Sequence, residues 1–94
     1  MYFELKFEWD EEKDRTNQIK HGISFEAARW VFLDEYRIEF FDETHSNNED
    51  RYITIGQSGN TLLVLFVVYT ERDDTIRIIS ARKADAKERR RYYD

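Results

Sequence analysis

The chain has 94 residues, enough for one small domain, and its 40% hydrophobic and 37% charged residues are typical of a globular protein. It has no cysteine, which excludes disulfides and thiolate metal sites. No apolar stretch approaches the roughly 20 residues of a membrane span, and the N-terminus is acidic where a secretion signal would be basic and then apolar. We therefore expect a single soluble domain over residues 1–94 that works in the cytoplasm.

The net charge of −5 is unevenly distributed along the chain. Residues 1–50 carry 6 basic and 14 acidic side chains, a net charge of −8, whereas residues 51–94 carry 9 basic and 6 acidic ones, a net charge of +3. The C-terminal half can therefore form a local patch that attracts phosphate. The alternative is a solvated surface of mixed charge.

The N-terminal segment predicts a strand and then a helix. Residues 3–9 alternate between apolar and polar side chains, as a half-buried strand does. Asp10 is typical of a helix N-cap and Gly22 of the residue that follows a helix. We therefore expect a helix over residues 11–21.

A second helix and a second strand follow. Ser24 can cap a helix whose apolar stripe has helical spacing. The stripe consists of Phe25, Ala28, Val31 and Phe32. Residues 36–41 return to alternation and predict a strand, and residues 42–50 form a polar loop.

The next two strands are predicted to form a hairpin. Residues 51–57 and 61–70 are strand-like and flank the turn sequence "SGN". The continuous apolar run from Leu62 to Tyr69 is typical of a central strand covered on both faces.

The C-terminal segment predicts one more strand and a helix. Residues 75–83 are strand-like, and Asp85 and Glu88 have capping-box spacing for a helix that ends near Tyr93. Two N-terminal helices, a mostly antiparallel sheet and a C-terminal helix give an α+β domain.

The first helix is unusually polar, with only Ile19 offered for burial together with Thr16 and the preceding Trp9. Such a helix must dock through few contacts or present polar side chains to a ligand. One candidate group shares one side of its C-terminal end: Asn17, Lys20 and His21. The alternative is that the last two only cap the helix, where the macrodipole favours positive charge.

The last strand combines isoleucines with cations. Unbroken alternation places Ile76, Ile78, Ser80 and Arg82 on one face, and Arg77, Ile79, Ala81 and Lys83 on the other. An arginine beside a buried strand must meet a carboxylate, reach the end of the sheet or line a groove for an anion. Glu39 and Glu71 are possible internal partners, so a structural ion pair is the alternative to an anion site.

Several kinds of site are not indicated. The two histidines lie far apart with no tight carboxylate cluster, so we expect no metal and no cofactor. No glycine-rich phosphate loop and no activated nucleophile can be recognised. The remaining cations, imidazoles, glutamate and tyrosines suit phosphoryl transfer on RNA, in which the substrate's own 2′-hydroxyl is the nucleophile.

Three stretches resemble the BrnT family of type II toxin–antitoxin systems: "FEWDEEKDRTNQIKHGISFEAA", "RYITIG" and "VVYTERDDTIRIISARKADAKERRRYY". The resemblance covers nearly the whole chain. It implies a RelE-like fold and a ribonuclease that arrests translation without a metal cofactor. It also implies a BrnA-like ribbon-helix-helix antitoxin, which blocks the toxin and represses the operon, so that operator DNA is bound only through the complex.

The resemblance also suggests site residues. "KHG" falls on Lys20 and His21, the strand-initial arginine on Arg51, and "YTER" and "RIISARK" supply the remaining ones: Tyr69, Glu71, Arg72, Arg77, Arg82 and Lys83. The chain departs from the family pattern at Gln57, where a basic residue often follows "IG".

Our hypothesis for the reaction gives each group a role. Arg51, Arg77 and Arg82 bind the scissile phosphate. His21 or Glu71 takes the 2′-hydroxyl proton, and Lys20 or Lys83 assists the leaving 5′-oxygen. The basic final helix steers RNA or docks an acidic antitoxin segment, and the expected RNA contacts are Arg72, Lys83, Lys87, Arg90 and Tyr92.

Two other functions are compatible with the sequence pattern. A toxin of the same fold class can act on a protein such as a topoisomerase, which predicts DNA damage and no RNA cleavage. A non-enzymatic subunit can use its basic face only to bind antitoxin or operator DNA, which predicts harmless expression.

Overall fold

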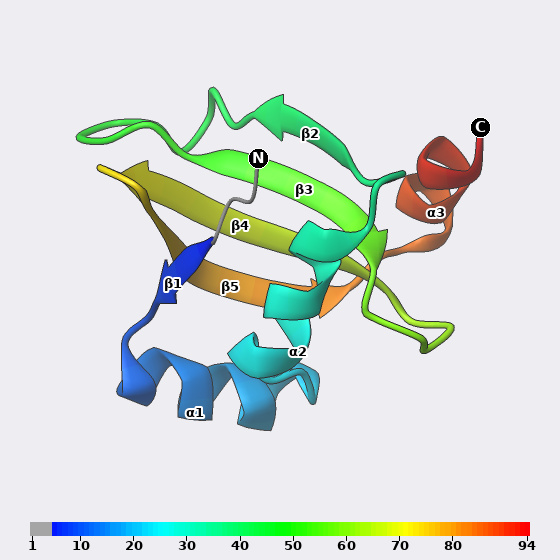
Figure 1. The fold of residues 1–94 in the computed structure, drawn as a ribbon, viewed down its shortest axis with the longest axis horizontal. Coiled ribbons are helices and arrows are strands. Elements are labelled where there is room, and N and C mark those ends of the chain that lie inside the picture. Colours follow the sequence, from blue (N-terminus) through cyan, green and yellow to red (C-terminus); the bar gives the residue numbers. More distant parts are fainter. Residues whose placement is uncertain (1–4) are drawn as a thin grey trace.

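The computed structural model describes residues 5–94, so residues 3 and 4 of the first predicted strand lie outside the described part. A five-stranded mixed sheet has the order β1-β5-β4-β3-β2 (Figure 1). β1 pairs in parallel with β5, and the other three pairings are antiparallel. The elements are β1 (Lys6–Glu8), α1 (Glu11–His21), α2 (Phe25–Arg29), the 3₁₀ helix η1 (Trp30–Leu33), β2 (Ile38–Phe41), β3 (Tyr52–Gln57), β4 (Val64–Arg72), β5 (Thr75–Lys83) and α3 (Ala86–Tyr93). The α+β class is confirmed.

The first helix begins and ends where its capping residues predicted. The Asp10 carboxylate accepts hydrogen bonds from the amides of Glu12 and Lys13, and Gly22 has the left-handed φ of 71° that closes the helix. The second helix is shorter than its apolar stripe suggested. Ser24 caps α2, but the chain tightens into η1 at Trp30.

The polar helix α1 docks through Asn17, which is buried against β5. Its amide nitrogen donates to the carbonyls of Ala81 (2.7 Å) and Ile23 (2.8 Å), and its amide oxygen accepts from the Ala81 N–H at 3.2 Å. β1 pairs only with the first three residues of β5, so Asn17 satisfies backbone groups on the edge that β1 leaves open. The expectation that Ile19 is buried was wrong, because that side chain is 82% exposed.

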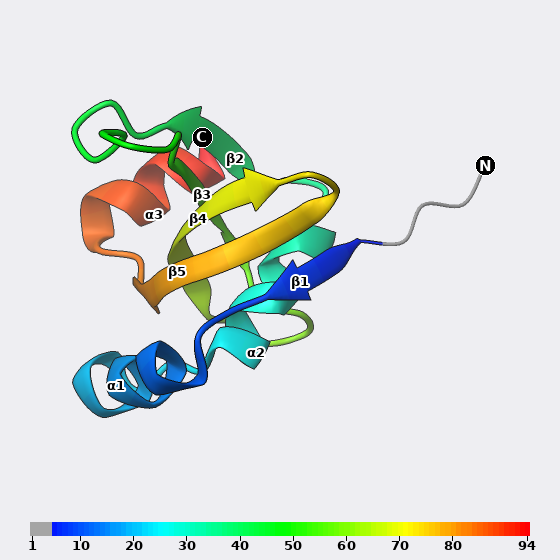
Figure 2. The same ribbon diagram turned by 90° about the vertical axis from the view of Figure 1, so that its left-hand side faces the viewer.

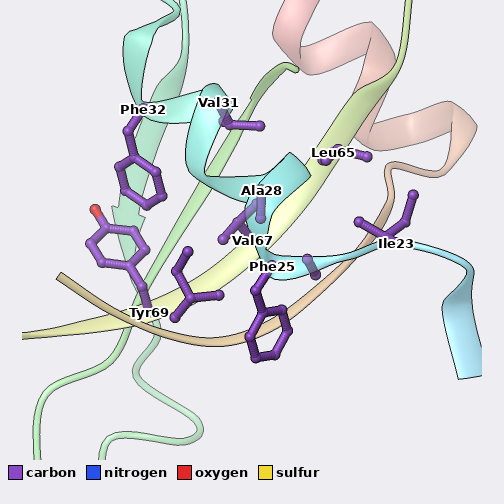
Figure 3. Close-up of a cluster of buried hydrophobic side chains, with 10 residues drawn as sticks. Ile23, Phe25, Ala28, Val31, Phe32, Leu65, Val67 and Tyr69 are labelled. Atoms are coloured by element: carbon purple, nitrogen blue, oxygen red, sulfur yellow. The ribbon is translucent and has the colours of Figure 1, made fainter. Parts of the chain in front are cut away.

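Apolar side chains form one cluster on each face of the sheet. The helix-side cluster lies between the sheet and α2 with η1, and Figure 3 shows Phe25, Phe32, Val67 and Tyr69 within it. The opposite cluster is covered by α3, which lies across the sheet from α2 (Figure 2). Because α3 is a short helix placed at one end, it does not extend over the other end of this second face (Figure 1).

A bulge interrupts the pairing of β4 with β5. Val68 pairs with Ser80, but the next residue, Tyr69, pairs with Ile78, so Ile79 is an extra residue in β5. A bulge of this kind shifts the alternation of side chains by one position.

The bulge reverses the predicted faces of the second half of β5. Ile78 and Ala81 both belong to the helix-side cluster. Arg82 faces the other way, with its guanidinium 4.0 Å from the ring of Phe66 in the opposite cluster. The predicted grouping of Arg82 with Ile78 was wrong, because it assumed unbroken alternation.

The central strand begins later than the apolar run predicted. Ser58 donates its amide to the Leu63 carbonyl at 2.9 Å, and Gly59 has a φ of 60°, so residues 58–63 form the turn. Leu62 lies in this turn with 93% of its surface exposed, and β4 starts at Val64. Only the part of the run from Val64 is in the strand.

Candidate active site

The loop over residues 42–50 is closed by a small hydrogen-bond network. The Ser46 hydroxyl donates to the Asp42 carbonyl at 2.6 Å and accepts from the Arg51 N–H at 2.8 Å. The Asp42 N–H donates to the Arg51 carbonyl at 2.9 Å. These bonds hold the loop against the start of β3, beside the β4–β5 hairpin.

A pocket of about 390 Å³, which we call the arginine pocket, opens between this loop and β4. Its lining residues are His45, Asn47, Asn48, Glu49, Arg51 and Arg72. Arg72 is half-exposed and binds Glu49 at 3.2 Å. Within residues 5–94, the Arg51 side chain is half-buried and makes no ion pair within 4.0 Å. A guanidinium so placed is suited to bind an anion from solution.

A third arginine lies one strand further across the same face. Arg77 pairs with Thr70 of β4, and Tyr69 of β4 pairs with Tyr52 of β3. Arg51 directly precedes Tyr52 and so lies opposite Thr70. Arg51 and Arg77 are therefore on either side of β4, about 10 Å apart. The Arg77 guanidinium binds Glu8 at 2.7 Å, and the Arg77 side chain is 27% exposed. Its partner is therefore Glu8 of β1 and neither of the two glutamates considered from the sequence.

The same pocket contains a histidine held by a buried carboxylate. Nδ1 of His45 lies 3.0 Å from Oδ2 of Asp42. The Asp42 side chain is 10% exposed and the His45 side chain 65% exposed. Sequence reasoning missed this pair. Its only signal was an aspartate three residues before a histidine in a polar loop that leads into Arg51.

The other end of the face is organised around Arg82. Its two terminal nitrogens donate to the two carboxylate oxygens of Glu88 at 2.8 and 2.9 Å. Glu88 also accepts from the Asp85 N–H, which completes the predicted capping box of α3. The hydrogen bonds from Arg82 lower the pKa of Glu88 although partial burial opposes this, and the same hydrogen bonds raise the pKa of Arg82. Arg82 thus joins β5 to α3.

This geometry corrects the expectation that Arg82 shares one phosphate with Arg51 and Arg77. Arg82 is five residues beyond Arg77 in β5, which is about 16 Å along an extended strand. Its guanidinium is directed to Glu88 and Phe66 at the α3 end. The structure therefore brings Arg51, Arg72 and Arg77 to one end and leaves Arg82 at the other.

Lys20 and His21 lie in a different groove, between α1 and β5. This groove has a volume of about 440 Å³ and is lined by Asp10, Glu12, Lys13, Thr16, Asn17, Lys20, His21, Ile79 and Ser80. It shares no lining residue with the arginine pocket.

Glu71 and Lys83 lie on the helix side of the sheet. Glu71 pairs with Ile76 and Lys83 with Leu65, and both partners pack in the helix-side cluster. Because directly paired residues point to the same face, neither side chain faces the arginine pocket. Glu71 as the base and Lys83 as the group that assists the leaving 5′-oxygen therefore stay predictions, and neither side chain lies on the face that carries Arg51.

The residues predicted on the final helix have different environments. Lys87 and Arg90 are exposed on α3. The Tyr92 hydroxyl instead donates to Asp34 at 2.5 Å, and burial with this carboxylate raises the pKa of Tyr92 to about 12. Tyr92 thereby joins α3 to the loop after η1, and its ring packs against the apolar cluster on that face.

A family model described as "Ribonuclease toxin, BrnT, of type II toxin-antitoxin system" matches residues 9–88. The chain belongs to this family. It is therefore a ribonuclease toxin with an RNA target and a protein antitoxin, and the resemblance noted in the sequence is confirmed. No curated protein matches the chain.

The BrnT match includes both arginine-bearing ends of the face, since it contains residues 45–77 and reaches Glu88. The ribonuclease family does not favour the topoisomerase-directed or non-enzymatic alternatives. Within residues 5–94, no group of three His, Cys, Asp or Glu side chains is placed to hold a metal ion. No described helix is long and apolar enough to cross a membrane.

Proposed function

We propose that this BrnT toxin cleaves RNA without a metal ion and that the arginine pocket, with Arg77 beside it, holds the scissile phosphate. The observation that carries the proposal is Arg51, a half-buried guanidinium with no ion-pair partner among the described residues. Arg72 lines the same pocket and Arg77 lies one strand away. One guanidinium group can bind two phosphate oxygens at once. Three such groups near one another can therefore hold the scissile phosphate and its neighbours in the RNA backbone.

The chemistry assigned to the arginines is charge stabilisation. When the 2′-oxygen of RNA attacks phosphorus, negative charge accumulates on the non-bridging oxygens of the phosphate. Fixed cations stabilise that charge more than they stabilise the ground state. Because the nucleophile belongs to the substrate, the protein needs to supply only positive charge and proton transfer.

RNA on either side of the cleaved bond is proposed to follow the cations of the same molecule. The α1–β5 groove offers Lys20 and His21, α3 offers Lys87 and Arg90, and Lys83 lies at the end of β5 on the helix side of the sheet. Arg82 and Tyr92 support α3 through Glu88 and Asp34, so we assign them to holding this surface in place.

The finer assignments follow the same reasoning. The helices on one face of a mixed sheet and the C-terminal helix on the other support a RelE-like assignment for one domain. The exposed cations of α3 support docking of an acidic segment of a BrnA-like ribbon-helix-helix antitoxin. Operator DNA would then be bound only through that complex. Both RNA cleavage and DNA binding would take place in the cytoplasm.

The test is cleavage of purified RNA by the isolated chain with EDTA present. We expect EDTA to leave the rate unchanged and Arg51→Ala to lower it on the order of 100-fold or more. Arg15→Ala, on the exposed side of α1 where Arg15 binds Glu12, is the matched control. An Arg51→Ala protein with the parental rate and a parental circular dichroism spectrum would rule out the assigned phosphate site, and loss of cleavage in EDTA would rule out the metal-free mechanism.

A further inference from the structure

We propose that His45 is the general base of RNA cleavage and that Asp42 is the positioning residue that holds its imidazole in the tautomer with the lone pair on Nε2. The inference rests on the proposed function, because it adds a proton acceptor to the arginine pocket. His45 was not among the residues that the sequence motifs suggested.

The first argument is the hydrogen bond between the two side chains. A carboxylate can only accept hydrogen bonds, so Asp42 must receive the proton on Nδ1 of the neutral imidazole. The lone pair of His45 is then on Nε2. Asp42 is buried and needs this partner, whereas most of the imidazole is exposed. The carboxylate therefore selects the tautomer whose basic nitrogen is directed away from it.

The second argument is the position of the imidazole among the arginines. The network through Ser46 ties the loop to Arg51, so His45 and Arg51 line one pocket with a fixed backbone between them. The charged groups that face this pocket are Glu49 on the loop, Arg51 at β3 and Arg72 on β4. In RNA, the attacking 2′-hydroxyl belongs to the nucleotide whose 3′-oxygen is bonded to the scissile phosphate. A phosphate held by these arginines brings that hydroxyl into the same pocket.

The step is balanced as follows. Nε2 of His45 takes the proton of the 2′-hydroxyl, and the 2′-oxygen forms a bond to phosphorus. The bond between phosphorus and the 5′-oxygen breaks, and the leaving 5′-oxygen takes a proton from water. The products are a 2′,3′-cyclic phosphate and a 5′-hydroxyl, and the imidazolium returns its proton to the hydroxide that remains.

The competing assignment is His21, the other histidine of the chain. His21 lies in the α1–β5 groove, beside Ile79 and Ser80 and apart from Arg51 and Arg72. If His21 were the base, other cations would have to hold the phosphate. The two assignments therefore predict different effects of Arg51→Ala on the cleavage rate.

The experiment compares initial rates of RNA cleavage for His45→Ala, His45→Gln and His21→Ala. Glu43→Ala is the control for disturbance of the loop, because Glu43 is exposed and does not line the pocket. We expect both His45 variants to lose at least about 100-fold in rate. Binding of an oligonucleotide that lacks 2′-hydroxyls should stay within about twofold of the parental affinity, and Glu43→Ala should cleave at the parental rate.

The dependence of the rate on pH provides a readout that a structural role would not change. The parental rate should rise with pH and then reach a plateau once the imidazole that accepts the proton is neutral. The residual rate of His45→Ala should rise with hydroxide concentration and show no plateau. Asp42→Asn should fold and bind the oligonucleotide but lose rate, because an amide can donate to Nδ1 and so favour the wrong tautomer.

The outcomes separate the two proposals. A parental rate or an unchanged plateau in the folded His45 variants, with Arg51→Ala inactive, would overturn the role of His45 and leave the phosphate site standing. A larger loss in His21→Ala than in His45→Ala would also overturn it. A parental rate in Arg51→Ala would overturn the proposed function and the role of His45 with it.

Discussion

The arginines at the two ends of the sheet face that α3 covers in part differ in their ion-pair partners, although Arg77 and Arg82 belong to one strand. At the hairpin end, Arg51 is half-buried without an ion pair among the described residues, and Arg72 and Arg77 hold single carboxylates. At the α3 end, Arg82 is bound through two hydrogen bonds to Glu88 and stacked on Phe66.

The comparison teaches that an arginine's role is set by the partner its strand position provides. Arg82 meets Glu88 because the capping box of α3 fixes that glutamate directly beyond the strand. Beside Arg51 lies the polar loop, in which Asp42 is bound to His45 and Glu49 is bound to Arg72. Arg82 therefore forms an internal ion pair, which was one of the two alternatives that the sequence left open. Arg51 remains a cation that is available to bind RNA.

The most direct test of this difference is to remove one arginine from each end and compare the two variants. Arg51→Ala should lose on the order of 100-fold or more in cleavage rate with a nearly unchanged melting temperature, because it removes charge stabilisation and no ion pair among the described residues. Arg82→Ala should keep most of its rate per folded molecule. Cleavage assays and thermal melts on the same preparations check this, and the reverse pattern would show that the ends are assigned the wrong way round.

Stability should change at the α3 end instead. Arg82→Ala removes two charge-assisted hydrogen bonds and a cation–π contact, and partial exposure reduces their value, so we expect a loss of about 1 kcal/mol in the free energy of unfolding. Urea denaturation measures it. A double-mutant cycle with Glu88→Gln should show coupling of about 0.5 kcal/mol, and additive losses would mean that the pair contributes nothing.

The same pair makes a prediction about pH. The folded-state pKa of Glu88 is lowered from its usual 4.5, so the pair stabilises the protein above about pH 4.5, and this stabilisation is lost as the pH falls through the lowered value. The difference in unfolding free energy between the parent and Glu88→Gln should therefore shrink on acidification. Urea curves at neutral pH and near pH 3 test this, and a difference that persists unchanged at the lower pH would contradict it.

The smallest effect is expected from the exposed cations of α3. Lys87→Ala should weaken RNA binding by only a few-fold and reduce the slope of log affinity against log salt concentration by less than one unit. Affinity for an uncleavable oligonucleotide, measured at several salt concentrations, provides the check. A loss as large as that of Arg51→Ala would place the phosphate site on α3.

The elements of the fold were largely predictable because their signals are local. Asp10, Gly22 and Ser24 mark helix ends by bonds to backbone only a few residues away, and Asp85 with Glu88 does the same for α3. The family was likewise predictable from its motifs, and the comparison confirmed it. The order of strands and the parallel pairing of β1 with β5 had no local signal, because they join segments far apart in the chain.

The sequence by itself therefore determined the α+β class, the helix ends and the BrnT family. The tertiary structure alone decided which charged groups meet. One extra residue, Ile79, shifts the second half of β5 by one position and turns Arg82 toward α3. Asn17 lies in the motif beside Lys20 and His21, but it is buried at the edge of β5, 64 residues from its partner Ala81. The closure of one loop through Ser46 likewise brings His45 to Arg51. These contacts depend on the register in which distant segments pair, and patterns of neighbouring residues do not determine that register.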